Sequence, residues 1–253
     1  MIIWKEKNMT LKVLIDQSHN EAIQSIPEKY LNDLDLIFDI NNPNDDFCEE
    51  NCLEKYDLLI LGNPRPNNNS EILFKTDELH NIKEFVKNGG SILITSGSHG
   101  DYNFENSFGS LRIFYRLNGI QRYYYSILYH PDKELTYHKK YNLIFNSFPE
   151  HPIFSEFEPG EKIVLGKSTF FNIHPEVNVT LLLHTRPGTM LQDFDTQHKL
   201  SASNQPIMVS HKYYKGKIVT IAASNFLTND PESGVSVESN SKLLKGIFNW
   251  LLS

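Results

Sequence analysis

The stretch that most constrains the fold of this chain is a helical pattern that runs through two glycines into a short apolar segment. Residues 77–87 have apolar side chains at helical spacing, and Gly89-Gly90 predicts the end of that helix. Ile92–Ile94 has the length and composition of a buried strand. It runs into Thr95–Asp101, whose glycines permit a tight turn. A helix, a buried strand and a turn in this order are typical of α/β proteins.

The first 125 residues repeat this alternation of strand and helix signals. Further buried strands are predicted at Lys12–Ile15, Leu36–Ile40 and Asp57–Leu61, and a helix at Glu21–Leu31 that Ser18 or Asn20 caps. Such alternation predicts an α/β fold of three layers, in which a mostly parallel, flavodoxin-like sheet is flanked by helices.

The last third of the chain predicts a different arrangement. Strands are expected at Lys162–Phe171, Val179–His184, Pro206–Tyr213 and Lys217–Ala223, with a hairpin turn at Lys215-Gly216 and a closing helix at Leu243–Leu252. This C-terminal hairpin is expected to add antiparallel strands to the sheet. The polar segment Gly188–Asn204 is predicted to be a mobile loop.

The middle of the chain has no clean periodicity. Residues 102–150 are rich in aromatic side chains and are predicted to form an insertion packed over the sheet, with a helix near Leu111–Asn118. No stretch rich in Gly, Pro or Ser separates two parts of the chain. We therefore expect residues 1–253 to form a single domain.

Composition narrows the possible functions. The chain has 253 residues and a net charge of −7, which argues against nucleic-acid binding. Cys48 and Cys52 would share one face of a helix, a poor geometry for a disulfide, so both are expected to be free thiols. The sequence shows no signal peptide and no apolar run long enough to span a membrane. We expect a cytoplasmic protein that binds a protein partner or a small polar ligand and holds no metal or other cofactor.

Polar residues gather where the predicted parallel strands end. The carboxyl ends of such strands meet at one edge of a sheet, where ligands bind in open α/β folds. We therefore expect one concave pocket bordered by Asp16, Ser18, His19, Asn63, Ser96, Ser98, His99 and Asn225. An alternative is that Asp16, Ser18 and Asn20 cap a helix. Arg65, between two prolines, is suited to binding an anion or a partner carboxylate, and the alternative is a solvated loop.

A catalytic alternative uses the turn at residues 96–99. Ser96 or Ser98 would be the nucleophile and His99 or His19 its base, in an amidase, esterase or sugar-processing hydrolase. A further alternative is a metal site made of His19, His99 and either Asp16 or Asp101. No Gly-x-Ser-x-Gly, P-loop or His-Glu-x-x-His motif is present.

Several stretches, in this order, resemble the class I glutamine amidotransferase-like superfamily. They are VLIDQSH (13–19), YDLLILG (56–62), FVKNGGSILIT (85–95), HPIF (151–154), YKGKIVTI (214–221), AASNF (222–226) and NWLL (249–252). Within the superfamily, the chain looks most similar to the amino-terminal domains of intraflagellar transport subunit 52. It also resembles prokaryotic relatives associated with ABC-type transport and gliding.

The resemblance implies the same α/β fold, and one difference bears on activity. Members that hydrolyse glutamine have a cysteine in the sharp turn after the strand that corresponds to Ile92–Ile94, where this chain has Ser96-Gly97-Ser98. An unactivated serine hydroxyl is a much poorer nucleophile than a thiolate. The resemblance therefore implies a non-catalytic binding or scaffold domain. It also implies a possible association of the chain with a larger transport or cytoskeletal assembly.

Overall fold

The computed structural model describes most of the chain. It covers residues 11–19, 21, 26, 28–31, 36–42, 45, 47, 49, 52–62, 74–97, 120–122, 126–194, 196–223 and 225–253. The predicted helix near residues 111–118 and the site residues Asn63, Ser98 and His99 lie outside these ranges, as do Arg65 and Asp101.

A mixed sheet of seven strands runs through the molecule, in the order β10-β13-β14-β4-β3-β1-β2. Its strands are β1 (Lys12–Ile15), β2 (Ile37–Ile40), β3 (Leu58–Gly62), β4 (Ser91–Thr95), β10 (Thr180–His184), β13 (Pro206–Tyr213) and β14 (Gly216–Ile221). The pairs from β14 to β2 are parallel, whereas β13 runs antiparallel to both of its neighbours. The sheet is thus mixed, and the expected C-terminal hairpin is the β13–β14 pair.

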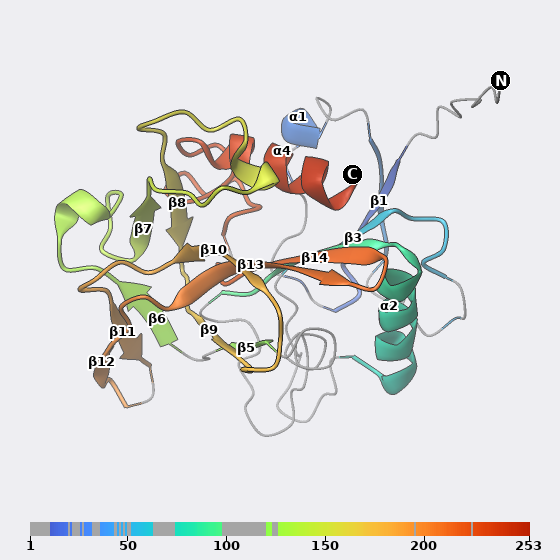
Figure 1. Cartoon of the computed structure of the whole chain (residues 1–253), viewed down its shortest axis with the longest axis horizontal. Helices are drawn as coiled ribbons and strands as arrows, with labels where there is room; N and C mark the ends of the chain where they lie inside the picture. Colours follow the sequence, from blue (N-terminus) through green and yellow to red (C-terminus); the bar gives the residue numbers. More distant parts are fainter. Residues whose placement is uncertain are drawn as a thin grey trace.

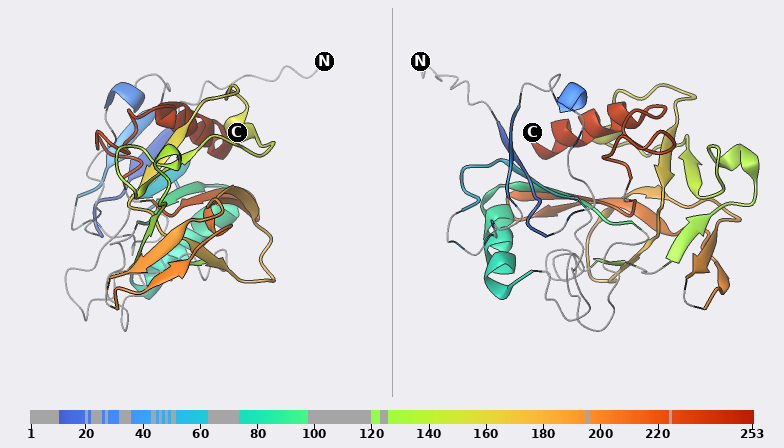
Figure 2. Two further views of the ribbon diagram at one scale, coloured as in Figure 1. Left: turned by 90° about the vertical axis from the view of Figure 1, so that its left-hand side faces the viewer. Right: turned by 180° about the vertical axis from the view of Figure 1, so that it is seen from behind.

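Helices cover both faces of this sheet. Helix α2 (Thr76–Asn88) lies on one side, and α4 (Asn240–Leu251) lies on the other (Figures 1 and 2). Both amphipathic helices turn their apolar residues inward, and β3 and β4 are entirely buried between the layers. The sequences of the central strands are therefore continuous apolar runs, which is typical of parallel strands covered on both faces.

Smaller sheets extend the molecule beyond the main sheet. Two of them pair β5 (Ile120–Arg122) with β9 (Phe171–Ile173) and β7 (Asn142–Phe145) with β8 (Ile163–Gly166). In the third, β11 (Met190–Asp193) lies between β6 (Ser126–Tyr129) and β12 (Lys199–Ser201). Single 3₁₀ turns occur at Lys133–Leu135 and Pro152–Phe154. In the described part of the 102–150 insertion, β5, β6 and β7 all pair with strands from later in the chain.

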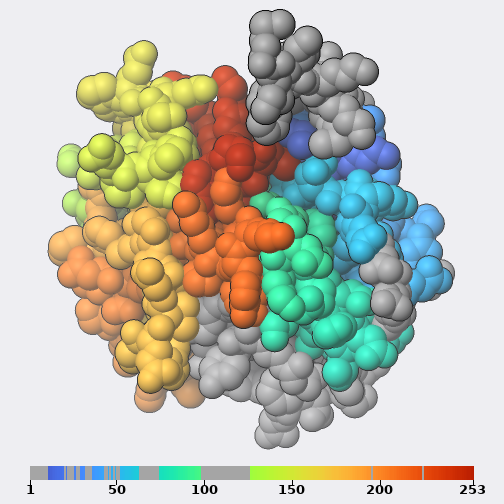
Figure 3. Space-filling model, turned by 45° about the vertical axis from the view of Figure 1, so that its right-hand side comes forward, coloured from blue at the N-terminus to red at the C-terminus, as the bar shows by residue number. Residues whose placement is uncertain are grey.

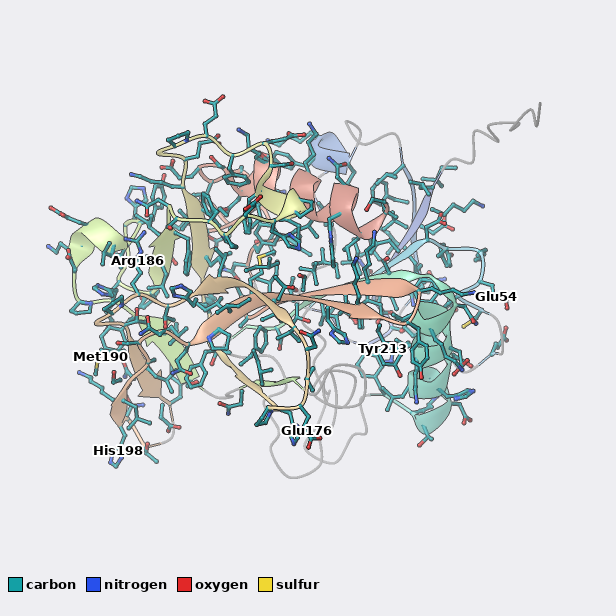
Figure 4. The ribbon with its side chains drawn as sticks, in the orientation of Figure 1. Glu54, Glu176, Arg186, Met190, His198 and Tyr213 are labelled. Carbon is teal, nitrogen blue, oxygen red and sulfur yellow. The ribbon has the colours of Figure 1, made fainter. Side chains whose placement is uncertain are left out.

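The prediction of a mobile loop at Gly188–Asn204 is wrong, because this segment contains the β11–β12 hairpin. Strand β11 also pairs with β6, about sixty residues earlier, and buries Leu191. Met190 and His198 mark this hairpin at the end of the molecule opposite Glu54 (Figure 4). The polar composition of the segment concealed a strand whose stability depends on a distant partner.

The predicted helix at Glu21–Leu31 is confirmed only at its end. Among its described residues, Glu28–Leu31 form α1, whereas Glu21 and Ile26 are not helical. In the sequence Pro27 follows Ile26, and a residue before proline is disfavoured in the helical region. The cysteine segment is likewise not helical at its described positions: residues 52–55 form a turn that contains the half-buried Cys52. Cys48 lies outside the described residues.

Two boundaries in the last third of the chain also differ from the prediction. The expected strand at Lys162–Phe171 is divided between β8 and β9, which belong to different sheets. In the hairpin, Tyr213 pairs with Gly216, so Tyr214 and Lys215 form the turn.

Gly216 allows the hairpin to approach helix α2 closely. A Cβ at this position would lie 2.2 Å from the Gly90 carbonyl oxygen and 2.3 Å from that of Val86. The hairpin can pack this closely against the end of α2 only without that side chain (Figure 3).

Candidate functional site

Four loops of the predicted pocket start at the same edge of the main sheet. Strands β1, β3, β4 and β14 are parallel neighbours, so their carboxyl ends lie side by side. Gly62 pairs with Thr95, and Thr95 pairs with Ile221 on the other side. Asp16 follows β1 and Ser96 follows β4, and the backbone N–H groups of these two residues donate to Ile60 and Ile221 of adjacent strands.

Three of the predicted residues form one hydrogen-bonded cluster. The His19 ring nitrogen Nδ1 lies 2.6 Å from Asp16 Oδ2 and 2.9 Å from Ser18 Oγ. The Ser18 hydroxyl donates to Asp16 Oδ1 at 2.7 Å, and its backbone N–H donates to the same oxygen at 3.0 Å. Asn41 Nδ2 adds a third donor to this oxygen at 2.8 Å, so the Asp16 carboxylate is fixed on both sides.

Glu78 holds the opposite nitrogen of His19. The two side chains meet at 3.0 Å, between His19 Nε2 and Glu78 Oε1. Glu78 also accepts the backbone N–H groups of Phe47 at 3.0 Å and of Lys75, the residue just before helix α2, at 2.7 Å. A single buried carboxylate thus connects the start of α2 and Phe47 to the loop after β1.

Aromatic rings enclose the histidine. Phe74 stacks on the His19 ring with centroids 3.9 Å apart, and the ring of Phe47 lies 5.6 Å away. Only 5% of His19 is exposed, and Asp16 is fully buried. Because this environment excludes water, the charges of the cluster act on one another more strongly than they would at the surface.

Glu21 completes the cluster. Its Oε2 accepts the His19 backbone N–H at 3.0 Å, while its Oε1 lies 4.0 Å from His19 Nδ1. Glu21 is 7% exposed, and Oε1 has no hydrogen-bond partner among the described residues. Ligand atoms of Asp16, His19 and Glu21 all lie within 4.8 Å of one another.

The charges of the cluster depend on this packing. Burial opposes the charge on His19, but its hydrogen bonds to Asp16 and Glu78 outweigh that effect and raise the pKa of His19 to about 10. Burial likewise opposes charge on the two carboxylates, yet the same bonds hold the pKa values of Asp16 and Glu78 below their usual ranges. Burial, and secondarily the Asp16 charge, raises the pKa of Glu21 to about 9.

The remaining described site residues do not bond to this cluster. Ser96 is fully buried, and its Oγ has no hydrogen-bond partner in the described part of the chain. Asn225 lies beyond β14, where its Nδ2 donates to Asp230 Oδ2 at 2.9 Å.

A hollow of about 590 Å³ lies beside the cluster, along strand β2. Its lining includes Asn41 and Phe47, which also contact the cluster, and it is bordered by the carboxylates of Asp39, Asp45 and Glu49. Lys55 is the cation in its lining. The hollow is therefore predominantly acidic.

The sequence analysis missed Glu21, Asn41 and Glu78. A signal existed for Glu78: it lies four residues before Ile82 and seven before Phe85, on the apolar face of its helix. A carboxylate on a buried helix face requires a partner. Glu21 lies two residues from His19, but the sequence analysis treated it only as the first residue of the helix predicted at Glu21–Leu31.

Comparisons with known proteins bear on the fold. No family profile and no curated protein matches the chain. Among solved structures, the mmIFT52 amino-terminal domain has a TM-score of 0.72 at 16% identity, covering 95% of this chain and 97% of that one. Cytoplasmic Protein STM1381 from Salmonella typhimurium LT2 has a TM-score of 0.61 at 14% identity, with coverages of 95% and 99%.

A ThuA-like protein from Bacteroides uniformis ATCC 8492 has a TM-score of 0.55 at 17% identity, covering 96% of this chain and 91% of that one. At such low identities the likeness shows a shared α/β fold. The expected similarity to the amino-terminal domain of IFT52 thus holds for the fold. None of the helices in the described ranges is long and apolar enough to cross a membrane.

Proposed function

We propose that this chain is a non-catalytic binding domain of the glutamine amidotransferase-like superfamily, and that it recognises a protein partner at the open edge of its main sheet. The non-catalytic part of this proposal rests on the hydrogen-bond partners and the protonation of the His19 ring. A general base needs a free nitrogen within hydrogen-bond reach of its nucleophile. Both ring nitrogens of His19 face carboxylates, at 2.6 and 3.0 Å, and the raised pKa keeps the ring protonated at neutral pH.

The adjacent serines fit the same proposal. Ser18 is within reach of His19, but its hydroxyl donates to Asp16 Oδ1. Ser96 is fully buried, and no described histidine bonds to its hydroxyl. Neither serine therefore has a base positioned to activate it within the part of the chain that the structure describes.

The outer edge of strand β2 supports the proposal that the chain binds a protein partner. Among the described strands it pairs with β1 alone, so its outer edge offers backbone N–H and C=O groups to another strand. Ile37 and Ile40 on this strand are 44% and 51% exposed. Extended segments of partner proteins bind at such edges through backbone hydrogen bonds, and side-chain pockets provide the specificity.

The charges beside β2 define the chemistry of the partner. Asp39, Asp45 and Glu49 surround the hollow that Ile40 also lines, and the whole chain has a net charge of −7. We therefore propose an extended partner segment in which aliphatic residues alternate with Lys or Arg. A cytoplasmic location and membership of a larger transport or cytoskeletal assembly belong to the same proposal.

Paired variants at the two edges of the sheet test the binding site. Tagged full-length chain would be captured from its own cells, and each recovered partner would then be purified and titrated against three proteins: wild type, Ile40→Asp and Leu181→Asp. Leu181 is the control because it is 41% exposed on β10, the opposite edge strand. We expect Ile40→Asp to weaken binding at least tenfold and Leu181→Asp to leave it unchanged.

Equal binding by wild type and Ile40→Asp, or the absence of any saturable partner, would contradict the edge-strand proposal. The non-catalytic part has its own test in a fluorophosphonate probe, which labels activated serines. We expect no labelling of the native chain. Labelling that requires Ser96 or Ser98 and is lost on replacing a histidine would instead establish the Ser/His hydrolase.

A further inference from the structure

The loop after β1 brings three metal-ligating side chains together within six residues. Asp16, His19 and Glu21 each direct one ligand atom to a common space, where these atoms lie within 4.8 Å of one another. All three side chains are buried. Buried ionisable groups are costly unless they pair with one another or bind a metal.

The pairing within this group is incomplete at one atom. The side chains of Asp16 and His19 both have hydrogen-bond partners, and Glu21 Oε2 accepts the His19 backbone N–H. Glu21 Oε1 is buried, has no hydrogen-bond partner among the described residues, and faces His19 Nδ1 from 4.0 Å. A buried carboxyl oxygen without a geometric hydrogen-bond partner, next to an imidazole nitrogen and a second carboxylate, requires an explanation, and a bound ion would supply one.

We propose that Asp16 Oδ2, His19 Nδ1 and Glu21 Oε1 bind one divalent transition-metal ion, for which Zn²⁺ is the best match. Relative to the metal site considered from the sequence, which was made of His19, His99 and either Asp16 or Asp101, Glu21 takes the place of His99. This inference is independent of the proposed partner-binding edge, because its three residues lie in the loop after β1.

The surroundings of the three ligands match those of metal sites. A ligating histidine usually donates its other ring N–H to a carboxylate, which fixes the orientation of the ring. Here His19 Nε2 lies 3.0 Å from Glu78 Oε1, and Phe74 stacks on the ring face. Asp16 is held through its other oxygen by Ser18 and Asn41. The supporting shell of a carboxylate–histidine–metal arrangement is therefore present.

The distances require only a small rearrangement. Zinc bonds to nitrogen and oxygen of about 2.0–2.2 Å in a tetrahedral site separate two ligand atoms by about 3.4 Å. The 2.6 Å contact between Asp16 and His19 would widen by about 0.8 Å, and the 4.0 Å separation of Glu21 from His19 would shorten by about 0.6 Å. Ser18 Oγ, 2.9 Å from Nδ1, or a water molecule would occupy the fourth position.

Metal binding at this site would release protons. Zinc is bound by neutral imidazole nitrogen and by ionised carboxylate oxygen, so any proton on His19 Nδ1 or on the Glu21 carboxyl group would pass to solvent when the ion binds.

The donor set selects the class of metal. Imidazole nitrogen favours zinc, copper, iron and nickel, whereas magnesium and calcium prefer all-oxygen sites with several waters. One imidazole and two carboxylates in a confined, largely dry space therefore favour a small transition-metal ion. No redox step is involved.

Zinc titration of the full chain tests the site. Protein stripped with a chelator would be titrated with Zn²⁺ in competition with a chromogenic chelator, and wild type compared with Glu21→Gln, Glu78→Gln and Glu84→Gln. Glu84 is the matched control, because it lies on the same helix as Glu78 but pairs with Lys87 at the surface. We expect one tight zinc ion per wild-type chain. Glu78→Gln should lose about 10- to 100-fold in affinity, Glu21→Gln at least as much, and Glu84→Gln nothing.

Glu21→Gln suits this test because the amide is close in shape to the protonated carboxyl group, and circular dichroism would verify its fold. X-ray absorption of the wild-type zinc complex supplies the second measurement. It should show one imidazole nitrogen and carboxylate oxygens at about 2.0–2.2 Å. Absence of stoichiometric zinc, equal affinity of wild type and Glu21→Gln, or a zinc shell without imidazole would overturn the proposal.

Discussion

At the scale of single residues, His19 organises the most unusual feature of the molecule. Its ring lies between two buried carboxylates, and a third carboxyl group, Glu21, approaches the same nitrogen as Asp16. Removing one partner of a buried ion pair is strongly destabilising, since it leaves an uncompensated charge. The cluster therefore couples the protonation of these groups to folding, whether or not it also binds a metal.

The pH dependence of stability should reveal this coupling. Glu21 holds its proton up to about pH 9 in the folded chain but loses it near 4.5 when unfolded. For His19 the corresponding values are about 10 and 6.5. Between pH 6.5 and 9 the folded state thus binds more protons, so the free energy of unfolding falls as pH rises, by up to about 1.4 kcal/mol per pH unit for each group.

Glu21→Gln isolates one of the two contributions, because the amide does not titrate. Urea unfolding in the presence of a chelator, from pH 5 to 9, should show about half the wild-type slope above pH 6.5 for this variant. Glu84→Gln should follow the wild-type slope. Superimposable profiles for wild type and Glu21→Gln would show that Glu21 is ionised in the folded chain.

At the scale of elements, β11 shows why a polar segment became a strand. In the β11–β12 hairpin Leu191 pairs directly with Leu200, yet the two leucines differ in environment. Leu191 is buried beside β6, whereas Leu200 is 47% exposed. The hairpin is therefore held by one buried side chain and by backbone pairing to β6, rather than by local turn preference.

This pair of leucines provides a matched comparison. Leu191→Ala should lower the free energy of unfolding by about 2–5 kcal/mol, because it leaves a cavity between β11 and its neighbours. Leu200→Ala should change it by no more than about 0.5 kcal/mol. Urea unfolding of both variants measures the difference. Equal effects would mean that the hairpin is not packed onto β6 in solution.

At the scale of the whole molecule, stability should be greatest at the centre of the seven-stranded sheet. Strands β3 and β4 are buried along their whole length and pair with neighbours on both sides, whereas β12 is exposed throughout. Segments with few buried contacts open locally without unfolding the rest of a protein.

Native-state hydrogen exchange should resolve this gradient. Amides of β3 and β4 should exchange only by global unfolding, so their opening free energy should equal that from urea unfolding. Amides of β12 should exchange much faster, through local opening that is insensitive to low urea. Equal protection of β4 and β12 would contradict the layered arrangement.

Local sequence signals determined much of the fold. The strands β1, β2, β3 and β4 and the helices α2 and α4 could be predicted to within a few residues, because each combines an apolar pattern with a clear stop such as Gly89-Gly90. The meeting of the strand ends at one sheet edge follows from their parallel order, and the loop that contains Asp16, Ser18 and His19 was predicted to lie at that edge for this reason.

Only the tertiary structure decided which partners those residues have. Glu78 is 59 residues from His19 along the chain, and the strand pairing of β11 with β6 spans a similar distance. No local pattern encodes such contacts. The sequence alone did not show that Glu21 is buried, since the cost of burying a carboxyl group depends on which groups surround it in the folded chain. The sequence thus specified the strands and the loop after β1, and packing converted that loop into a buried histidine–carboxylate cluster.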